Sequence, residues 1–218
     1  MSIIITIATT KGGAGKTTIA ELLLGATAEA GHRVAAIDAD LNHSLTDWVS
    51  HFNRYPITIQ HELDEGKIIP TVESLSNDHD LIVIDTAGAA TQATVFAVGC
   101  ADLVLIPCQL SSADVVEATK TMQLVNSAAA MSRQTIPARV VLTDYQPGTV
   151  IAGHVEHELA NCGLDVLPTK LNRLVAFKEM TFSGEVPLSG GAGALVGDFL
   201  RDVASIVSLP IEPMPLAS

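Results

Sequence analysis

Basic residues are scarce in this sequence. Lysine and arginine together number 12, against 24 aspartate and glutamate residues, and the formal net charge is −12. Proteins that bind nucleic acid derive much of their affinity from lysine and arginine at the phosphates. The chain therefore lacks the overall charge of a nucleic-acid binder, and any contact with DNA requires a local basic patch, doubled by dimerisation.

Cysteine is also rare, and long apolar runs are absent. The three cysteines, Cys100, Cys108 and Cys162, show no C-x-x-C spacing. This pattern predicts buried thiols in a reducing cytoplasm rather than a disulfide framework or a metal site. No apolar run reaches about 18 residues, as a membrane-spanning helix requires, and the first residues carry no basic leader. We expect a cytoplasmic protein that does not bind membranes.

Short apolar runs, by contrast, are frequent and alternate with helical patterns. Such runs predict strands buried on both faces, and the alternation predicts a three-layer, doubly wound, mostly parallel sheet of the α/β class. The expected strands are residues 3–8, 33–40, 57–61, 81–85, 103–107, 138–143 and 166–168. The expected helices are residues 19–26, 44–52, 68–77, 90–99, 113–131, 150–161, 174–182 and 194–209. We expect one domain over residues 1–218, with a proline-rich tail at 209–218.

A glycine-rich segment joins the first expected strand to the first expected helix. Its sequence is Thr10-Lys11-Gly12-Gly13-Ala14-Gly15-Lys16-Thr17-Thr18. Glycines let the backbone curl until successive N–H groups point inward, and the following helix adds its positive N-terminal end. The segment therefore predicts a phosphate-binding loop of the P-loop NTPase type.

The residues of this loop have separate expected roles. Lys16 reaches the β- and γ-phosphates, and the Thr17 hydroxyl binds Mg²⁺. Thr10 replaces the leading glycine of the usual G-x-x-x-x-G-K-[ST] pattern, and Lys11 adds a second lysine. At the mouth of the loop, Lys11 is placed to reach a nucleotide in a facing subunit, although a solvated side chain also fits the spacing. The expected nucleotide-binding residues are Lys11, Gly12, Gly13, Ala14, Gly15, Lys16, Thr17 and Thr18.

Three aspartates are expected near this loop. Asp85 ends an apolar strand 69 residues after Lys16, and we expect it to hold Mg²⁺ directly or through water. Of Asp38 and Asp40, we assign Asp38 to the Mg²⁺ shell and Asp40 to the orientation of the attacking water. The alternative for Asp85 is that it caps the following helix, and the alternative for Asp38 and Asp40 is that they are solvated loop residues. Gly88 would let the loop after Asp85 approach the γ-phosphate.

The sequence favours ATP over GTP. No N-K-x-D motif, which reads guanine, is present, because the segment Thr169-Lys170-Leu171-Asn172 lacks the acid.

A small group of basic residues is the candidate DNA contact. Lys170, Arg173 and Lys178 lie within nine positions near the start of a helix. A solvated helix face or a contact with the nucleotide base fits these residues equally well. The last helix, 194–209, has an apolar stripe and no run of lysines on its polar face, so we expect it to pack against the sheet rather than on a membrane.

At these residues the sequence resembles the ParA/MinD superfamily of deviant Walker ATPases. The resemblance covers most of the chain, and short ParF-like partition ATPases and VirC-type ATPases are the most similar groups. It rests on residues 11–18, 38–40, 44–48, 85–88, 173 and 184–187. The sequence departs from many relatives in having Asp40-Leu41-Asn42 in place of Asp-Pro-Gln, and Thr143-Asp144 in place of an Asn-Arg type pair.

The resemblance implies an ATP-bound sandwich dimer in which Lys11 crosses to the phosphates of the partner subunit. It also implies slow, Mg²⁺-dependent hydrolysis of ATP to ADP, with Lys11, Lys16 and Asp40 as catalytic residues. Non-specific DNA binding by the dimer and stimulation by a ParB-like adaptor complete the expectation of a nucleoid-associated partition ATPase. The alternatives are a MinD-like positioning ATPase that cycles on a membrane or organelle, and a VirC-like nucleotide-gated adaptor in DNA transfer.

Overall fold

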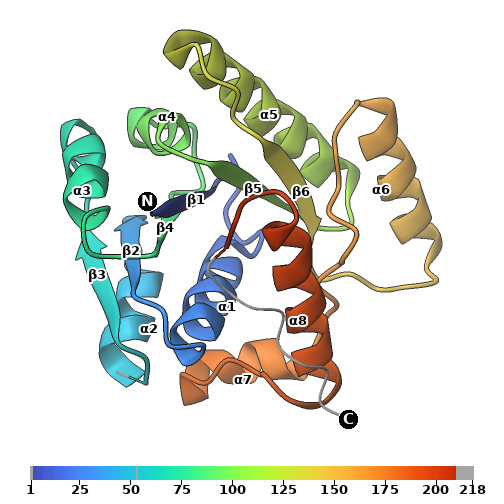
Figure 1. The fold of residues 1–218 in the computed structure, drawn as a ribbon. Helices are drawn as coiled ribbons and strands as arrows, with labels where there is room; N and C mark the ends of the chain where they lie inside the picture. Colours follow the sequence, from blue (N-terminus) through green and yellow to red (C-terminus); the bar gives the residue numbers. More distant parts are fainter. Residues whose placement is uncertain (1, 53, 210–218) are drawn as a thin grey trace.

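The computed structural model describes residues 2–52 and 54–209 and contains a six-stranded sheet (Figure 1). The order of the strands is β3-β2-β4-β1-β5-β6, and every pairing is parallel. Most strands are aliphatic along nearly their whole length, which suits a sheet buried on both faces. The strands are β1 (Ile3–Ile7), β2 (Val34–Ala39), β3 (Ile57–His61), β4 (Leu81–Thr86), β5 (Leu103–Cys108) and β6 (Ala138–Leu142).

Helices cover both faces of the sheet. The helices α1, α2, α7 and α8 share one core, and α3, α4, α5 and α6 pack on the opposite face (Figure 1). Strand residues alternate between these layers, as Val83 and Ile84 do, so the three-layer α/β prediction is confirmed. The bounds are α1 (Lys16–Glu29), α2 (Ser44–Phe52), η1 (Glu65–Lys67, a 3₁₀ turn), α3 (Ile68–Leu75), α4 (Gln92–Gly99), α5 (Ser112–Ser132), α6 (Val150–Asn161), α7 (Val175–Ser183) and α8 (Gly190–Ala204).

Two elements near the end of the chain differ from the prediction. The expected strand at 166–168 is only a single bridge between Val140 and Val166, because the Thr169 N–H, the next donor on the side that faces β6, bonds to Asp202 Oδ2 instead. The last helix spans Gly190–Ala204 rather than 194–209. Its glycine-rich first turn packs closely on the preceding chain, since a β-carbon at Gly193 would lie 2.3 Å from the carbonyl carbon of Leu188.

The last helix nevertheless packs as predicted, and its apolar residues Phe199 and Val203 lie in the core shared with α1. No helix within the described ranges is long and apolar enough to cross a membrane. The part of the proline-rich tail at 210–218 lies outside the described residues.

The prediction of buried thiols is correct only for Cys108. Cys100 is half-buried, and Cys162 is exposed. Cys162 is exposed because it caps the end of α6, beyond the part of that helix that packs on the sheet.

All six strands point their carboxyl ends to the same edge of the sheet. The glycine-rich segment follows β1 at this edge, and Asp38 and Asp85 lie side by side near the ends of β2 and β4. In open parallel sheets, ligands bind outside this edge. The sheet therefore assembles the predicted loop and the predicted carboxylates in one place.

Candidate nucleotide site

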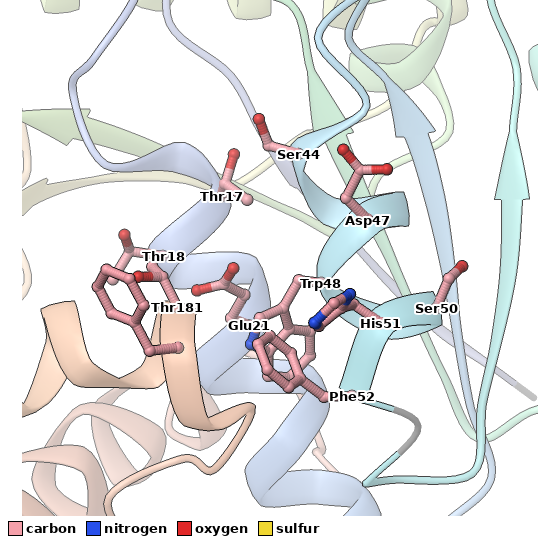
Figure 2. Close-up of a pocket in the computed structure, with 11 residues that line it drawn as sticks. Thr17, Thr18, Glu21, Ser44, Asp47, Trp48, Ser50, His51, Phe52 and Thr181 are labelled. Carbon is pink, nitrogen blue, oxygen red and sulfur yellow. The ribbon is translucent and has the colours of Figure 1, made fainter.

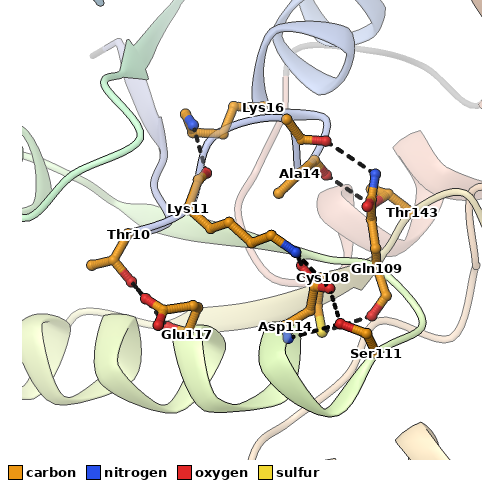
Figure 3. Close-up of polar contacts among 11 residues, drawn as sticks. Thr10, Lys11, Ala14, Lys16, Cys108, Gln109, Ser111, Asp114, Glu117 and Thr143 are labelled. Carbon is orange, nitrogen blue, oxygen red and sulfur yellow. Dashed lines mark hydrogen bonds and ion pairs between the residues drawn. The ribbon is translucent and has the colours of Figure 1, made fainter.

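The glycine-rich segment turns directly from β1 into α1 (Figure 3). Gly13 and Gly15 have φ of 76° and 97°, in the left-handed region that favours glycine. Thr143, just after β6, donates its hydroxyl to the Ala14 carbonyl at 2.8 Å. Gln109, just after β5, donates its side-chain amide to the Gly13 carbonyl at 3.0 Å. Side chains from two neighbouring strand ends therefore fix the shape of the loop.

The loop after β4 lies directly against the glycine-rich segment. A β-carbon built on Gly88 would lie 2.7 Å from the Gly12 nitrogen and 3.0 Å from the Lys11 carbonyl carbon. Contacts this short with backbone atoms leave no space for a side chain. Glycine at this position therefore allows the two loops to touch.

Lys16 is the buried cation of the site. The residue is 6% exposed, and its ammonium donates a hydrogen bond to the Lys11 carbonyl at 3.3 Å. Burial lowers the pKa of Lys16, and the carboxylates of Asp85 and Asp40 oppose that shift. The ammonium thus lies beside the first turn of α1, within the field of two predicted site aspartates.

The half-buried Thr17 and the buried Asp85 form an oxygen pair that suits a divalent cation. The Thr17 hydroxyl donates to Asp85 Oδ2 at 2.7 Å, while Asp85 Oδ1 is buried without a hydrogen-bond partner among the described residues. Burial raises the pKa of Asp85 to about 7, although the Thr17 hydroxyl and the Lys16 ammonium lower it. Mg²⁺ prefers oxygen ligands of this kind, so these residues fit the predicted metal.

Asp38 is engaged by the loop that follows β2. Its side chain is fully buried and accepts hydrogen bonds from the Thr46 amide at 2.9 Å, the Thr46 hydroxyl at 2.8 Å and the Asp40 amide at 3.1 Å. These three donors occupy both carboxylate oxygens. Asp38 therefore holds the start of α2 against the sheet edge, next to Asp85.

Asp40 stands just beyond β2 and is half-buried. One of its oxygens, Oδ1, accepts from the backbone and side-chain amides of Asn42, both at 2.9 Å. The other oxygen accepts no hydrogen bond from the described part of the chain. That oxygen is available to a water molecule.

Lys11 is held within its own chain (Figure 3). Its ammonium contacts both carboxylate oxygens of Asp114 at 2.9 Å. The Lys11 side chain is 39% exposed and that of Asp114 only 3%. The neighbouring Thr10 hydroxyl bonds to Glu117, one turn further along α5. The first turns of α5 therefore anchor the mouth of the glycine-rich segment.

Sequence reasoning did not identify Asp114, which lies 103 positions from Lys11. A local signal was available, because Ser111 and Asp114 form the S-x-x-D pattern that begins many helices. Ser111 caps α5 by accepting from the Asp114 amide, and its hydroxyl bonds back to the Asp114 carboxylate. This pattern would have shown that Asp114 is fixed, but not which cation it meets.

A cavity of about 280 Å³ opens beside the loop, between α1 and α7. Its walls combine apolar residues, such as Leu171 and Phe177, with polar residues that include Asn172. Two of the predicted DNA-contacting residues, Arg173 and Lys178, also line it. The cavity touches Gly13, Gly15 and Thr18, so it is continuous with the glycine-rich segment.

The three predicted DNA-contacting residues do not form one free basic patch. Arg173 pairs with Asp144 at 3.2 Å, and Lys170 pairs with Glu156 at 3.5 Å. Lys178 has no ion-pair partner among the described residues. All 12 lysines and arginines lie in the described ranges, where nine of them form ion pairs and Lys16, Arg133 and Lys178 form none.

The fold and the loop together define a nucleotide-binding domain of the P-loop type. The chain belongs to the CobQ/CobB/MinD/ParA nucleotide binding domain family, and the sequence model of that family matches residues 5–188. The resemblance stated from the sequence is therefore confirmed at the level of the family.

Three named relatives each match more than four fifths of the chain. ParA of Rhizobium radiobacter is 28% identical over 183 residues, which cover 81% of each chain. The maintenance of carboxysome distribution protein A of Halothiobacillus neapolitanus is 26% identical over 212 residues, covering 92% of this chain and 94% of that protein. VirC1 of Rhizobium radiobacter is 28% identical over 195 residues, covering 85% and 83% respectively.

Solved structures share the fold at lower identity. An ATP complex of a Cyanothece McdA variant gives a TM-score of 0.80 at 17% identity, covering 97% of this chain and 98% of that chain. MinD of Aquifex aeolicus gives 0.73 at 22% identity, covering 99% and 100%. At these identities the likeness shows the arrangement of the sheet and helices alone.

Proposed function

We propose that the chain binds ATP with Mg²⁺ and hydrolyses it to ADP and phosphate. One observation carries this proposal. The buried Lys16 ammonium lies within the electrostatic influence of Asp85, which is hydrogen-bonded to Thr17, at the carboxyl edge of the sheet. Backbone N–H groups of residues 12–18 and Lys16 would hold the β- and γ-phosphates. Thr17 and Asp85 would hold the metal, which supplies charge neutralisation at the phosphates, with Asp38 in its outer shell.

Asp40 is the proposed water-orienting residue. Its free oxygen lies in a loop that Asp38 and Thr46 fix to the sheet edge. Phosphoryl transfer needs chiefly positioning and charge neutralisation. A carboxylate that orients water, together with Lys16 and Lys11, is a sufficient set of groups for slow hydrolysis.

The cavity between α1 and α7 is the proposed seat of the adenine base. It adjoins the glycine-rich segment, and Leu171 and Phe177 offer apolar surface to a flat ring. Asn172 and Asp144 add polar groups at its wall.

Dimerisation through the nucleotide face is the second part of the proposal. Leu41, Val116, Val150 and Val175 are exposed to between 52% and 92%, and each lies shortly after a strand end or near the cavity. Burial of these exposed apolar side chains between two subunits would favour association. In the dimer, Lys11 would leave Asp114 and reach the phosphates of the facing subunit.

The proposed biological role is DNA partition in the cytoplasm, on the nucleoid, with a ParB-like adaptor that stimulates hydrolysis. The ParA relative supports this role. Lys170, Arg173 and Lys178 would supply the DNA contacts, doubled in the dimer. Because two of them already face carboxylates, the expected affinity for DNA is weak and depends strongly on salt.

A positioning role with a different cargo is the second candidate. The ion pairing of nine of the 12 basic residues favours it, because few cations are left for phosphates. A relative named for the distribution of carboxysomes belongs to this class. The similarity to VirC1 supports a further alternative, a nucleotide-gated adaptor in DNA transfer.

Two lysine variants test the proposal. Lys16→Ala should weaken ATP binding about a hundredfold through loss of charge-assisted phosphate contacts. Lys11→Ala should leave ATP binding intact but prevent the ATP-dependent dimer. Calorimetry measures the first effect and light scattering after gel filtration measures the second. Unchanged ATP binding by Lys16→Ala would overturn the proposed nucleotide site. A normal ATP-dependent dimer with Lys11→Ala would overturn only the proposed contact of Lys11 with the nucleotide of the partner subunit.

A further inference from the structure

A hollow of about 850 Å³ lies between α1, α2 and α7 (Figure 2). It borders the nucleotide site at Thr17 and Thr18 and extends away from it toward His51 and Thr181. Its lining includes hydroxyl, aromatic and carboxyl groups, but no lysine or arginine. The proposed ATPase activity assigns no use to this space.

Glu21 contributes a buried carboxyl group to this hollow. The residue is 3% exposed, and its Oε2 atom has no hydrogen-bond partner among the described residues. It lies one turn after Thr17 on α1, and Figure 2 shows its carboxyl between α1 and α2. Buried polar groups in proteins are nearly always paired, so a partner for this carboxyl is missing.

The surrounding side chains indicate the charge of that missing partner. Trp48 is fixed because its indole N–H donates to the Met180 carbonyl at 3.1 Å. Phe182 is 83% exposed at the rim, and Asp47 adds a second, exposed carboxylate. Aromatic faces combined with carboxylates form an environment that attracts cations.

We propose that this hollow receives an arginine side chain from a partner protein, with its guanidinium on Glu21 and Asp47 and its stem against Trp48 and Phe182. Arginine fits better than lysine because its planar guanidinium pairs with carboxylates through two hydrogen bonds and stacks on aromatic rings. The net charge of −12 also favours a basic partner. The proposal does not depend on ATP hydrolysis.

Trp48 makes the test direct, because it is the only tryptophan in the chain and lines the hollow. We expect a saturable change in its fluorescence when N-acetyl-arginine amide is added without nucleotide. N-acetyl-citrulline amide, which has the same shape without the charge, should give no saturable change. An equal response to both compounds would overturn the proposal.

A matched pair of variants on α1 locates the binding. At pH 8.5, where Glu21 is mainly ionised, Glu21→Gln should weaken arginine amide binding about tenfold, through loss of a charge-assisted hydrogen bond. Glu29→Gln removes the same charge from an exposed position on that helix and should change nothing. Unchanged binding by Glu21→Gln would overturn the proposal.

Phe182→Ala, an exposed change that leaves the core untouched, provides a second check and should also weaken binding. Equal binding by this variant and the unchanged chain would contradict the stacking at the rim. Spermidine is the probe for a free polyamine. Tighter saturable binding of spermidine than of arginine amide would overturn the assignment to a partner protein.

Discussion

Two buried carboxyl groups set the chemistry around the first turns of α1. Burial raises the pKa of Glu21 to about 8, with a further contribution from the Asp85 carboxylate, and burial raises that of Asp85 to about 7. Each group therefore binds its proton more tightly in the folded chain than in the unfolded chain. The folded state without bound metal accordingly becomes less stable as these groups ionise.

The first prediction concerns the pH dependence of stability. Because the folded pKa of Glu21 exceeds its unfolded value, the unfolding free energy should fall as pH rises from about 4.5 to about 8, by at most about 1.4 kcal/mol per pH unit. The Glu21→Gln variant has no carboxyl group to ionise at this position and does not lose this stability. Its unfolding free energy relative to that of the unchanged chain should therefore rise over that pH window. Urea denaturation at pH 5 and pH 8.5, without nucleotide or Mg²⁺, measures the difference.

Glu29→Gln serves as the control for this measurement, because its exposed side chain should give the same relative stability at both pH values. A constant difference between Glu21→Gln and the unchanged chain across the window would contradict the prediction.

At the scale of elements, α5 controls the mouth of the glycine-rich segment. Its first turn presents Asp114 to Lys11, and Ser111 fixes the Asp114 carboxylate. Its second turn presents Glu117 to Thr10. The helix therefore acts as a clamp on the residue that the proposed dimer requires in the facing subunit.

Asp114→Asn should weaken this clamp. Since the ion pair within the chain competes with the proposed contact between subunits, the ATP-dependent dimer should form at an about tenfold lower protein concentration. Sedimentation velocity over a concentration series measures the midpoint. Asp198→Asn, which breaks an exposed ion pair on α8, should leave the midpoint unchanged. A midpoint for Asp114→Asn at or above that of the unchanged chain would contradict the prediction.

Much of the fold could be predicted from the sequence because its signals are local. Aliphatic runs such as Leu81–Thr86 identify buried strands, and the glycine-rich segment identifies the phosphate loop. The contact between Lys11 and Asp114 could not be predicted, because it depends on the order of β1 and β5 in the sheet. Glu21 was likewise missed, since a single acid in an apolar helix does not show whether it faces solvent or a hollow.

At the scale of the whole molecule, charge limits the choice of partner. The acids outnumber the bases two to one, 24 against 12, and most bases are neutralised within the chain. A surface with few free cations attracts phosphates weakly. The proposed DNA contact therefore depends on a small number of residues, chiefly Lys178.

Lys178→Glu should weaken ATP-dependent DNA binding and reduce its salt dependence. Each lost phosphate contact lowers the slope of log K against log salt by about one. Fluorescence anisotropy with labelled duplex over a salt series measures both effects. Arg33→Glu makes the same change in charge before β2, at the amino edge of the sheet, and should have a smaller effect. Equal effects of the two changes would remove Lys178 from the DNA contact.

The internal neutralisation of the basic residues also affects how copies of the chain meet. Two chains with a net charge of −12 repel each other at long range, and screening over about 8 Å at physiological ionic strength limits that repulsion. Rising salt should therefore favour self-association while it disfavours attachment to DNA. In colloidal terms, ionic strength acts in opposite directions on self-association and on DNA binding. A cell that changes its salt content would therefore shift the balance between the dimeric and the DNA-bound forms.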